Sequence, residues 1–187
     1  VRDNGTWEAI GQKLSVPLKE NNCYDFSLGL TRSMFYKSRS RVTDEEADYV
    51  TPCVVRIWGG NEYCDRAQLL GETEEIVDTD WQEYSLSLMP LKNISYLIIE
   101  VYYTTSVLDP YNGNVLIDNA SVITYRLCTK NDTLIQEKNK NVKPEINYAN
   151  SIPKTNVDVI DQIAKKNTTT TRTISIALRL NPQQSVN

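Results

Sequence analysis

Residues 23–32, which read CYDFSLGLTR, decide the fold class. Large apolar side chains occupy every second position, and polar or small residues occupy the positions between them. Because successive side chains of a strand point to opposite faces, this alternation predicts a half-buried β-strand. The pair Asn21-Asn22 predicts a turn directly before it. The predicted inner face comprises Tyr24, Phe26, Leu28 and Leu30, and the outer face comprises Asp25, Ser27, Gly29 and Thr31.

Five more segments in the first two-thirds of the chain have the same extended character. No helical period separates them, so the pattern predicts an antiparallel β-sandwich. Residues 33–52 are charged and show no clear period, which indicates a long loop that is either functional or disordered. The further strands are predicted at 7–18, 53–59, 81–88, 96–103 and 114–126, and the 81–88 strand turns Tyr84, Leu86 and Leu88 inward and Glu83, Ser85 and Ser87 outward.

The composition changes near residue 128. Residues 129–145 are rich in Lys, Asn, Asp and Glu and contain few apolar residues, which predicts a linker. Residues 155–166 (TNVDVIDQIAKK) carry apolar residues at helical spacing and predict a helix between short strands at 146–149 and 173–180. The expected organisation is therefore a sandwich over 1–128, a linker over 129–145, and a β-α-β tail over 146–187 that is too short for a core of its own.

Composition excludes several classes of function. The chain of 187 residues holds 20 Lys and Arg, 24 Asp and Glu, and no His, with a net charge of −4. The absence of His excludes Ser-His and Cys-His catalysis and His-metal sites. The negative charge gives no general attraction to nucleic acid or anionic lipid, and neither GxGxxG nor GxxxxGK[ST] occurs. We therefore expect a binding or scaffolding module without enzymatic activity.

Several features indicate an exported protein. The chain starts at Val1 without Met or an apolar leader, so we expect either a removed signal peptide or a fragment of a longer chain. Four cysteines, abundant Tyr and several Asn-x-Ser/Thr triplets fit a secreted or envelope protein. The longest apolar runs are about eight residues, far short of a membrane span.

The cysteines predict disulfide bonds. If the 23–32 and 53–59 strands pair antiparallel, Cys23 lies close enough to Cys64 for a bridge. Cys53 and Cys128, which both lie at strand ends, then pair by elimination. Four cysteines allow three connectivities, and buried free thiols are a further alternative. No CxxC motif occurs, which argues against redox or zinc chemistry.

A series of segments resembles a known family. GTWEAIGQKLSVPL with NNCYDFSLGL, then VVRIWGG, YCDRAQLLGE, TDWQEYSLSLMP and NVLIDNASV, resembles the jelly-roll modules of the galactose-binding-like class, including the CenC-type carbohydrate-binding modules. The resemblance covers about residues 5–125. It is similar in particular to modules of bacterial cell-envelope proteins that also carry an OmpA-like domain. It implies a jelly-roll sandwich that recognises carbohydrate in a secreted or outer-membrane-associated protein.

The sequence departs from that family in two places. The family's N-terminal strands are absent, so we expect another segment to complete the sandwich. The tail 146–187 resembles the opening of an OmpA-like domain. Asn181-Pro182-Gln183-Gln184 stands where that domain's diaminopimelate-contacting motif is expected. The tail therefore departs from the peptidoglycan-binding pattern.

A sugar-binding platform is predicted from strand parity. Arg56 and Trp58 share one strand face, Glu100 and Tyr102 share the corresponding face of another strand, and Asp25 lies on a third. We predict that Trp58 and Tyr102 stack on a pyranose ring. Arg56, Glu100 and Asp25 would then bond its hydroxyl groups. The alternative is that the long loop or a partner protein covers this face.

Three other residues receive interpretations. Trp7 and Trp81 are interpreted as structural, because Trp81 matches the core-edge tryptophan of the family. The resemblance implies that Asp118, in the run Leu-Ile-Asp-Asn, holds a structural calcium ion. The alternative for Asp118 is a hydrogen bond to a loop backbone.

Two functions follow from the sequence. The first is non-catalytic recognition of a polysaccharide or of the glycan of peptidoglycan. The second is a structural subunit or protein-protein interaction module of an outer-membrane or cell-surface complex, tethered to the wall by its tail. A glycan binder would leave the face of Trp58 open, whereas a scaffold subunit would cover it.

Overall fold

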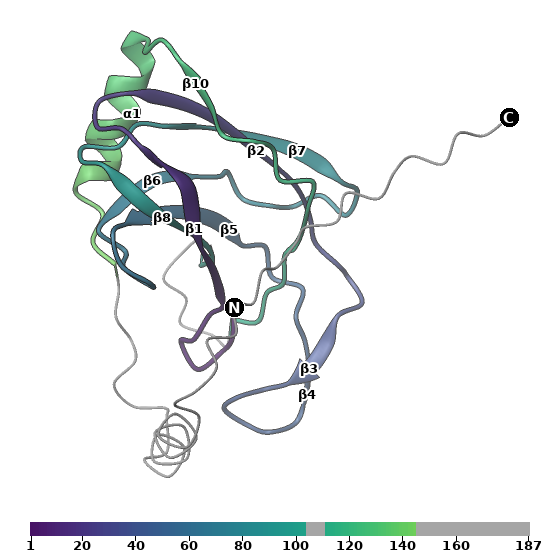
Figure 1. Ribbon diagram of the computed structural model, residues 1–187. Coiled ribbons are helices and arrows are strands. Elements are labelled where there is room, and N and C mark those ends of the chain that lie inside the picture. The colour runs from purple at the N-terminus through teal and green to yellow at the C-terminus, as the bar shows by residue number, and fades with distance from the viewer. Residues whose placement is uncertain (104–110, 145–187) are drawn as a thin grey trace, which may run out of the picture. The chain divides into compact units, whose positions relative to one another are not determined.

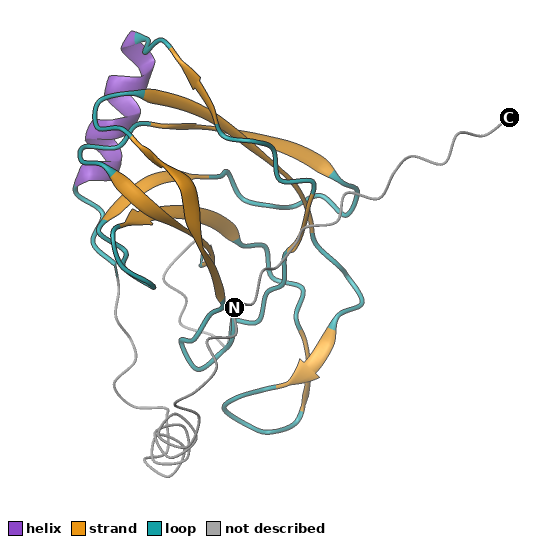
Figure 2. Cartoon of the chain, viewed as in Figure 1, coloured by secondary structure: helices purple, strands orange, loops and turns teal. Residues whose placement is uncertain are grey.

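The computed structural model describes residues 1–103 and 111–144, and these residues form a mostly β structure with antiparallel sheets (Figures 1 and 2). The β-α-β tail predicted over 146–187 lies outside the described residues. Among the described residues, no helix has the length and apolar character needed to cross a membrane.

Two sheets share a core. Sheet A has the order β1 (Ala9–Leu18), β8 (Ile94–Tyr102), β5 (Val54–Gly60), β6 (Gln68–Glu72). Sheet B has the order β10 (Thr124–Arg126), β2 (Cys23–Thr31), β7 (Gln82–Leu88), and β9 (Leu116–Asp118) also pairs with β2. A strand has only two edges, and β7 occupies one edge of β2, so β9 and β10 follow each other along the opposite edge. A small hairpin, β3 (Lys37–Arg39) with β4 (Glu46–Asp48), lies within the predicted loop.

The core confirms the alternation read from the sequence. The inner face of β2 is buried, and it packs with the inner residues of β5, β7 and β8. These side chains leave water together, which is the dominant stabilising contribution to a sandwich. The main buried members are Tyr24, Phe26, Leu28, Leu30, Val55, Ile57, Leu88 and Leu97.

Helix α1 (Lys130–Lys140) occupies the segment where composition predicted a linker. The backbone N–H of Thr129 donates to the Asp132 carboxylate at 2.6 Å, and this carboxylate also lies favourably at the positive end of the helix dipole. The helix packs against β6 through a polar contact, since the Asn139 amide donates to the carbonyl of Leu70. It lacks an apolar stripe, which explains why hydrophobic periodicity did not reveal it.

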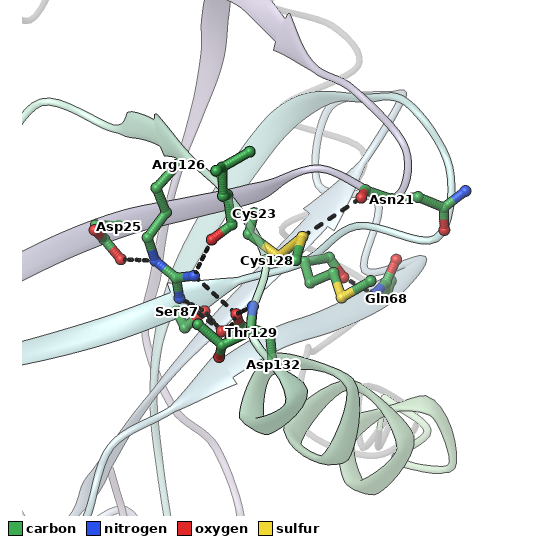
Figure 3. Close-up of a disulfide and its surroundings, with 11 residues drawn as sticks. Asn21, Cys23, Asp25, Gln68, Ser87, Arg126, Cys128, Thr129 and Asp132 are labelled. Atoms are coloured by element: carbon green, nitrogen blue, oxygen red, sulfur yellow. Dashed lines mark hydrogen bonds and ion pairs between the residues drawn. A yellow bond between two sulfur atoms is a disulfide. The ribbon is translucent and has the colours of Figure 1, made fainter.

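Arg126 joins the helix to sheet B (Figure 3). Its guanidinium lies 2.6 Å from Asp25 Oδ1 and 2.6 Å from the buried Asp132 Oδ1, and it donates to Ser87 Oγ at 2.7 Å. The Arg126 guanidinium holds the pKa of the Asp132 carboxyl far below its ordinary value. One cluster therefore connects β10, β2, β7 and α1.

The disulfide links Cys23 to Cys128, so both pairings proposed from the sequence are wrong. Their premise fails because the strands opened by Cys23 and Cys53 belong to different sheets. Cys23 is instead the cross-strand partner of Arg126, which brings Cys128 to a Cα–Cα distance of 5.2 Å (Figure 3). Cys53 is a buried free thiol whose pKa burial raises to about 11, and Cys64 is an exposed free thiol.

We predict that Asp132→Asn flattens the dependence of stability on pH. A carboxylate whose folded pKa is depressed stabilises the protein above its ordinary pKa of 3.8, and this contribution is lost as pH falls below that value. At pH 7 the substitution should cost about 3 kcal/mol, because Arg126 loses its buried partner. Urea unfolding at pH 7 and pH 3 measures both effects. The exposed Asp48→Asn is the control, and an unchanged pH dependence in Asp132→Asn would contradict the role of the cluster.

We predict that Cys128→Ser lowers the free energy of unfolding by about 3 kcal/mol. The bond spans 105 residues, so it removes much conformational freedom from the unfolded chain. Urea unfolding with and without reductant measures the loss, and Cys64→Ser should leave stability unchanged. If reductant still destabilised the Cys128→Ser protein, a different bridge would have to exist.

Candidate functional site

The structure brings four of the five predicted platform residues together on the outer face of sheet A. Arg56 of β5 is the cross-strand partner of Glu100 of β8. Tyr102, two residues after Glu100, is the cross-strand partner of Val54. Trp58 lies two residues beyond Arg56 on the same face. Asp25 does not join them, because β2 belongs to sheet B.

This face is covered, so the platform is not open as predicted. Trp58 is 1% exposed and Glu100 is 2% exposed. The indole N–H of Trp58 donates to Glu100 Oε2, and that of Trp7 donates to Oε1, both at 2.6 Å. Trp7 also packs edge-on against Tyr102, with ring centroids 5.0 Å apart. Among the described residues, Trp7 covers this face near Glu100 and Tyr102, and Val142 packs against Trp58.

Two arginines complete the cover. Arg66 Nε lies 2.8 Å from Glu100 Oε1 and forms an ion pair with it. Arg56 stacks 3.6 Å over the Tyr102 ring and pairs with Glu72 at 2.6 Å. Because Glu100 accepts from two indole N–H groups and pairs with Arg66, the cluster around it has a structural role.

The exposed outer face of sheet B carries a row of polar side chains. Asp25 lies opposite both Ser87 and Thr124, Ser27 lies opposite Ser85, and Gly29 lies opposite both Glu83 and Asp118. These positions alternate along their strands, so they share one face. We call this surface the hydroxyl face; it comprises Asp25, Ser27, Glu83, Ser85, Ser87, Asp118 and Thr124.

A hollow of about 520 Å³ lies on the hydroxyl face. Asp25 is held by Arg126 through Oδ1, and its second oxygen has no hydrogen-bond donor within residues 1–103 and 111–144. Ser121 contributes from the segment between β9 and β10, where its Oγ accepts from the backbone N–H of Ser27 at 2.8 Å. The lining residues are Asp25, Phe26, Ser27, Ser85, Leu86, Ser87, Ser121, Val122 and Thr124.

A second hollow, also of about 520 Å³, is mainly apolar. Trp81 lines it and is 53% exposed. Ile10 lines it as well and is 60% exposed. We call this hollow the apolar groove; it is lined by Glu8, Ala9, Ile10, Trp81, Ile99, Val101, Val115, Leu116, Ile117 and Asp118.

Asp118 lies on the hydroxyl face and at the rim of the apolar groove. Its Oδ1 accepts from the backbone N–H of Asn119 at 2.7 Å, which is the alternative role considered for it. Calcium needs six to eight oxygen ligands. Within residues 1–103 and 111–144, no three Asp, Glu or Cys side chains converge on one point.

The sequence did not reveal the hydroxyl face as a site, although alternation indicated which of its serines point outward. The outward parity of Ser27, Ser85 and Ser87 was predicted correctly from alternation. What alternation does not contain is the register between strands, which places Ser27 opposite Ser85. Without register, these serines were isolated surface residues.

A scan against protein-family models finds no match for the chain, and searches of curated proteins and of solved structures find none either.

We predict that Glu100→Gln lowers the free energy of unfolding by about 3 kcal/mol, because it leaves Arg66, whose side chain is only 15% exposed, without its counter-charge. Glu72→Gln is the matched control: its carboxylate also pairs with an arginine but is more exposed, so it should cost about 1 kcal/mol or less. Urea unfolding followed by tryptophan fluorescence reports both. If Glu100→Gln left the free energy of unfolding unchanged, the cluster would not be what holds this face closed.

Proposed function

We propose that this chain is a non-catalytic carbohydrate-recognition module that binds a glycan on the hydroxyl face of sheet B. The observation that carries the proposal is the hollow of about 520 Å³ lined by serine and threonine hydroxyls and the Asp25 carboxylate. Sugar hydroxyls both donate and accept hydrogen bonds. Serine and threonine hydroxyls do the same, and a carboxylate accepts.

The spacing of the sheet supports this reading. Adjacent strands lie about 4.8 Å apart, and alternate residues on one strand lie about 6.6 Å apart. Polar groups at these intervals match the span of a sugar ring and its substituents. Trp81, one residue before β7, offers a half-exposed ring for stacking near Asp118, and both residues line the apolar groove.

The finer fold and location belong to the same proposal. Strands distant in sequence are neighbours in both sheets, as β1 beside β8 and β9 beside β2, and such crossovers support a jelly-roll topology. The Cys23–Cys128 disulfide is compatible with an oxidising compartment, which supports a secreted or cell-envelope protein.

A second candidate function is a protein-protein interaction module of an envelope complex. The observation that favours it is the apolar groove, where Ile10 is largely exposed beside apolar walls.

We predict that Ser85→Phe weakens glycan binding at least tenfold, because an aromatic ring at this exposed position fills the hollow. The full chain is screened against soluble glycans, insoluble polysaccharides and purified peptidoglycan, and any binder is titrated by calorimetry. Ser15→Phe, at an exposed position of β1 outside the hollow, is the matched control and should bind normally.

One result would reject the function, and another would reject only the site. If no glycan bound the folded chain, carbohydrate recognition would be wrong. If a glycan bound Ser85→Phe and the original protein equally, the function would stand but the hydroxyl face would not be its site.

A further inference from the structure

The two sheets have unequal widths. Sheet A is four strands wide, whereas in the described residues sheet B has only three positions: the edge shared by β9 and β10, then β2, then β7. β6 contacts β7 at one side of the sandwich. Leu14 and Leu18 of β1 pack with the core between the sheets, whereas Ile10 and Gln12 near the start of β1 are exposed. The start of β1 therefore lies beyond the part of sheet A that sheet B covers.

The apolar groove lies at this unfilled position. Ile10 of β1 is the cross-strand partner of Ile99, whose side chain packs against the core, yet Ile10 is largely exposed. Val101, Val115 and Ile117 also line the groove and pack against the core. The groove is thus an open continuation of the core, and its exposed apolar surface would gain free energy if covered.

Backbone groups border the groove as well. β9 pairs with β2 along one edge, and within the described residues its other edge has no ladder partner. Such an edge presents N–H and C=O groups in the spacing that an added strand requires. A strand placed there would hydrogen-bond to β9 and turn alternate side chains toward Ile10 and Ile99.

The charges at the groove are negative. Among its lining residues only Glu8 and Asp118 are charged, and no Lys or Arg lines it. Glu8 pairs with Arg2, whereas Asp118 has no cationic partner among the described residues. An occupant with basic residues at its ends would complement this rim.

We propose that the apolar groove receives one extended segment of a partner protein, which adds to β9 as the fourth strand of sheet B. The segment carries apolar residues at alternate positions and Lys or Arg at its ends. Recognition of this kind draws affinity from backbone hydrogen bonds and specificity from the alternate side chains. The proposal goes beyond glycan recognition and names the partner chemistry for the second candidate function.

The test uses the full chain and a synthetic seven-residue peptide with Val at alternate positions, Thr between them and Lys at both ends. Binding is measured by calorimetry and by the fluorescence of Trp81, which lines the groove. Ile10→Glu should weaken binding about tenfold or more, because it places a charge in the apolar contact. Val16→Glu, an exposed apolar position of the same strand outside the groove, is the matched control and should bind normally.

Two further measurements separate strand addition from other contacts. A peptide of the same sequence with N-methylated backbone amides should not bind, because it cannot form the ladder. Hydrogen exchange of the β9 amides that point away from β2 should slow when the unmodified peptide is present.

Several outcomes would overturn the proposal. Equal binding of the N-methylated peptide, or an unaffected Ile10→Glu, would exclude strand addition in the groove. In the isolated monomeric chain, slow exchange of the β9 amides that point away from β2 would show that another segment of the chain occupies the position. If these amides exchanged slowly only at high protein concentration, the groove would be assigned to a second copy of this chain. None of these results depends on glycan binding, which is tested at Ser85.

Discussion

The buried carboxylate of Glu100 determines which surfaces of this protein are available. A charge with 2% exposure persists only where partners satisfy it, and here two indole N–H groups and Arg66 converge on its two oxygens. Trp7 must therefore cross the outer face of sheet A to reach it. This contact helps to close that face, whereas the hydroxyl face of sheet B stays exposed.

Sheet B is anchored at the start of β2. The Cys23–Cys128 disulfide and the cluster around Arg126 both lie there, and they tie β10 and α1 to this strand. Asp25 takes part in this cluster and also borders the hollow of the hydroxyl face. Its position is thus fixed by Arg126, and in the proposed glycan recognition this would lower the ordering cost of binding.

Features that depend on neighbouring residues, such as the strands, could be predicted from the sequence. Features that depend on which strands pair could not. Period-2 alternation located β2 and β7, because the inner face of each packs against the core. The choice of Cys23–Cys64 failed because alternation does not say which sheet a strand joins. Parity correctly placed Trp58 and Glu100 on one face, but the approach of Trp7, about 93 positions away from Glu100, left no local signal. Helix α1 went unseen because polar contacts, not an apolar stripe, hold it.

The two exposed surfaces have different chemistry because they arise from different features of the same sheet. The hydroxyl face results from strand alternation, which turns every second residue of β2 and β7 to solvent, and these positions are polar. The apolar groove results from a difference in sheet width, which leaves inner-face residues such as Ile10 without a covering strand. Asp118 borders both surfaces, since it lies on the outer face of β9 and at the rim of the groove. A strand added to β9 would therefore change the surroundings of a residue on the hydroxyl face, which couples the two surfaces through one carboxylate.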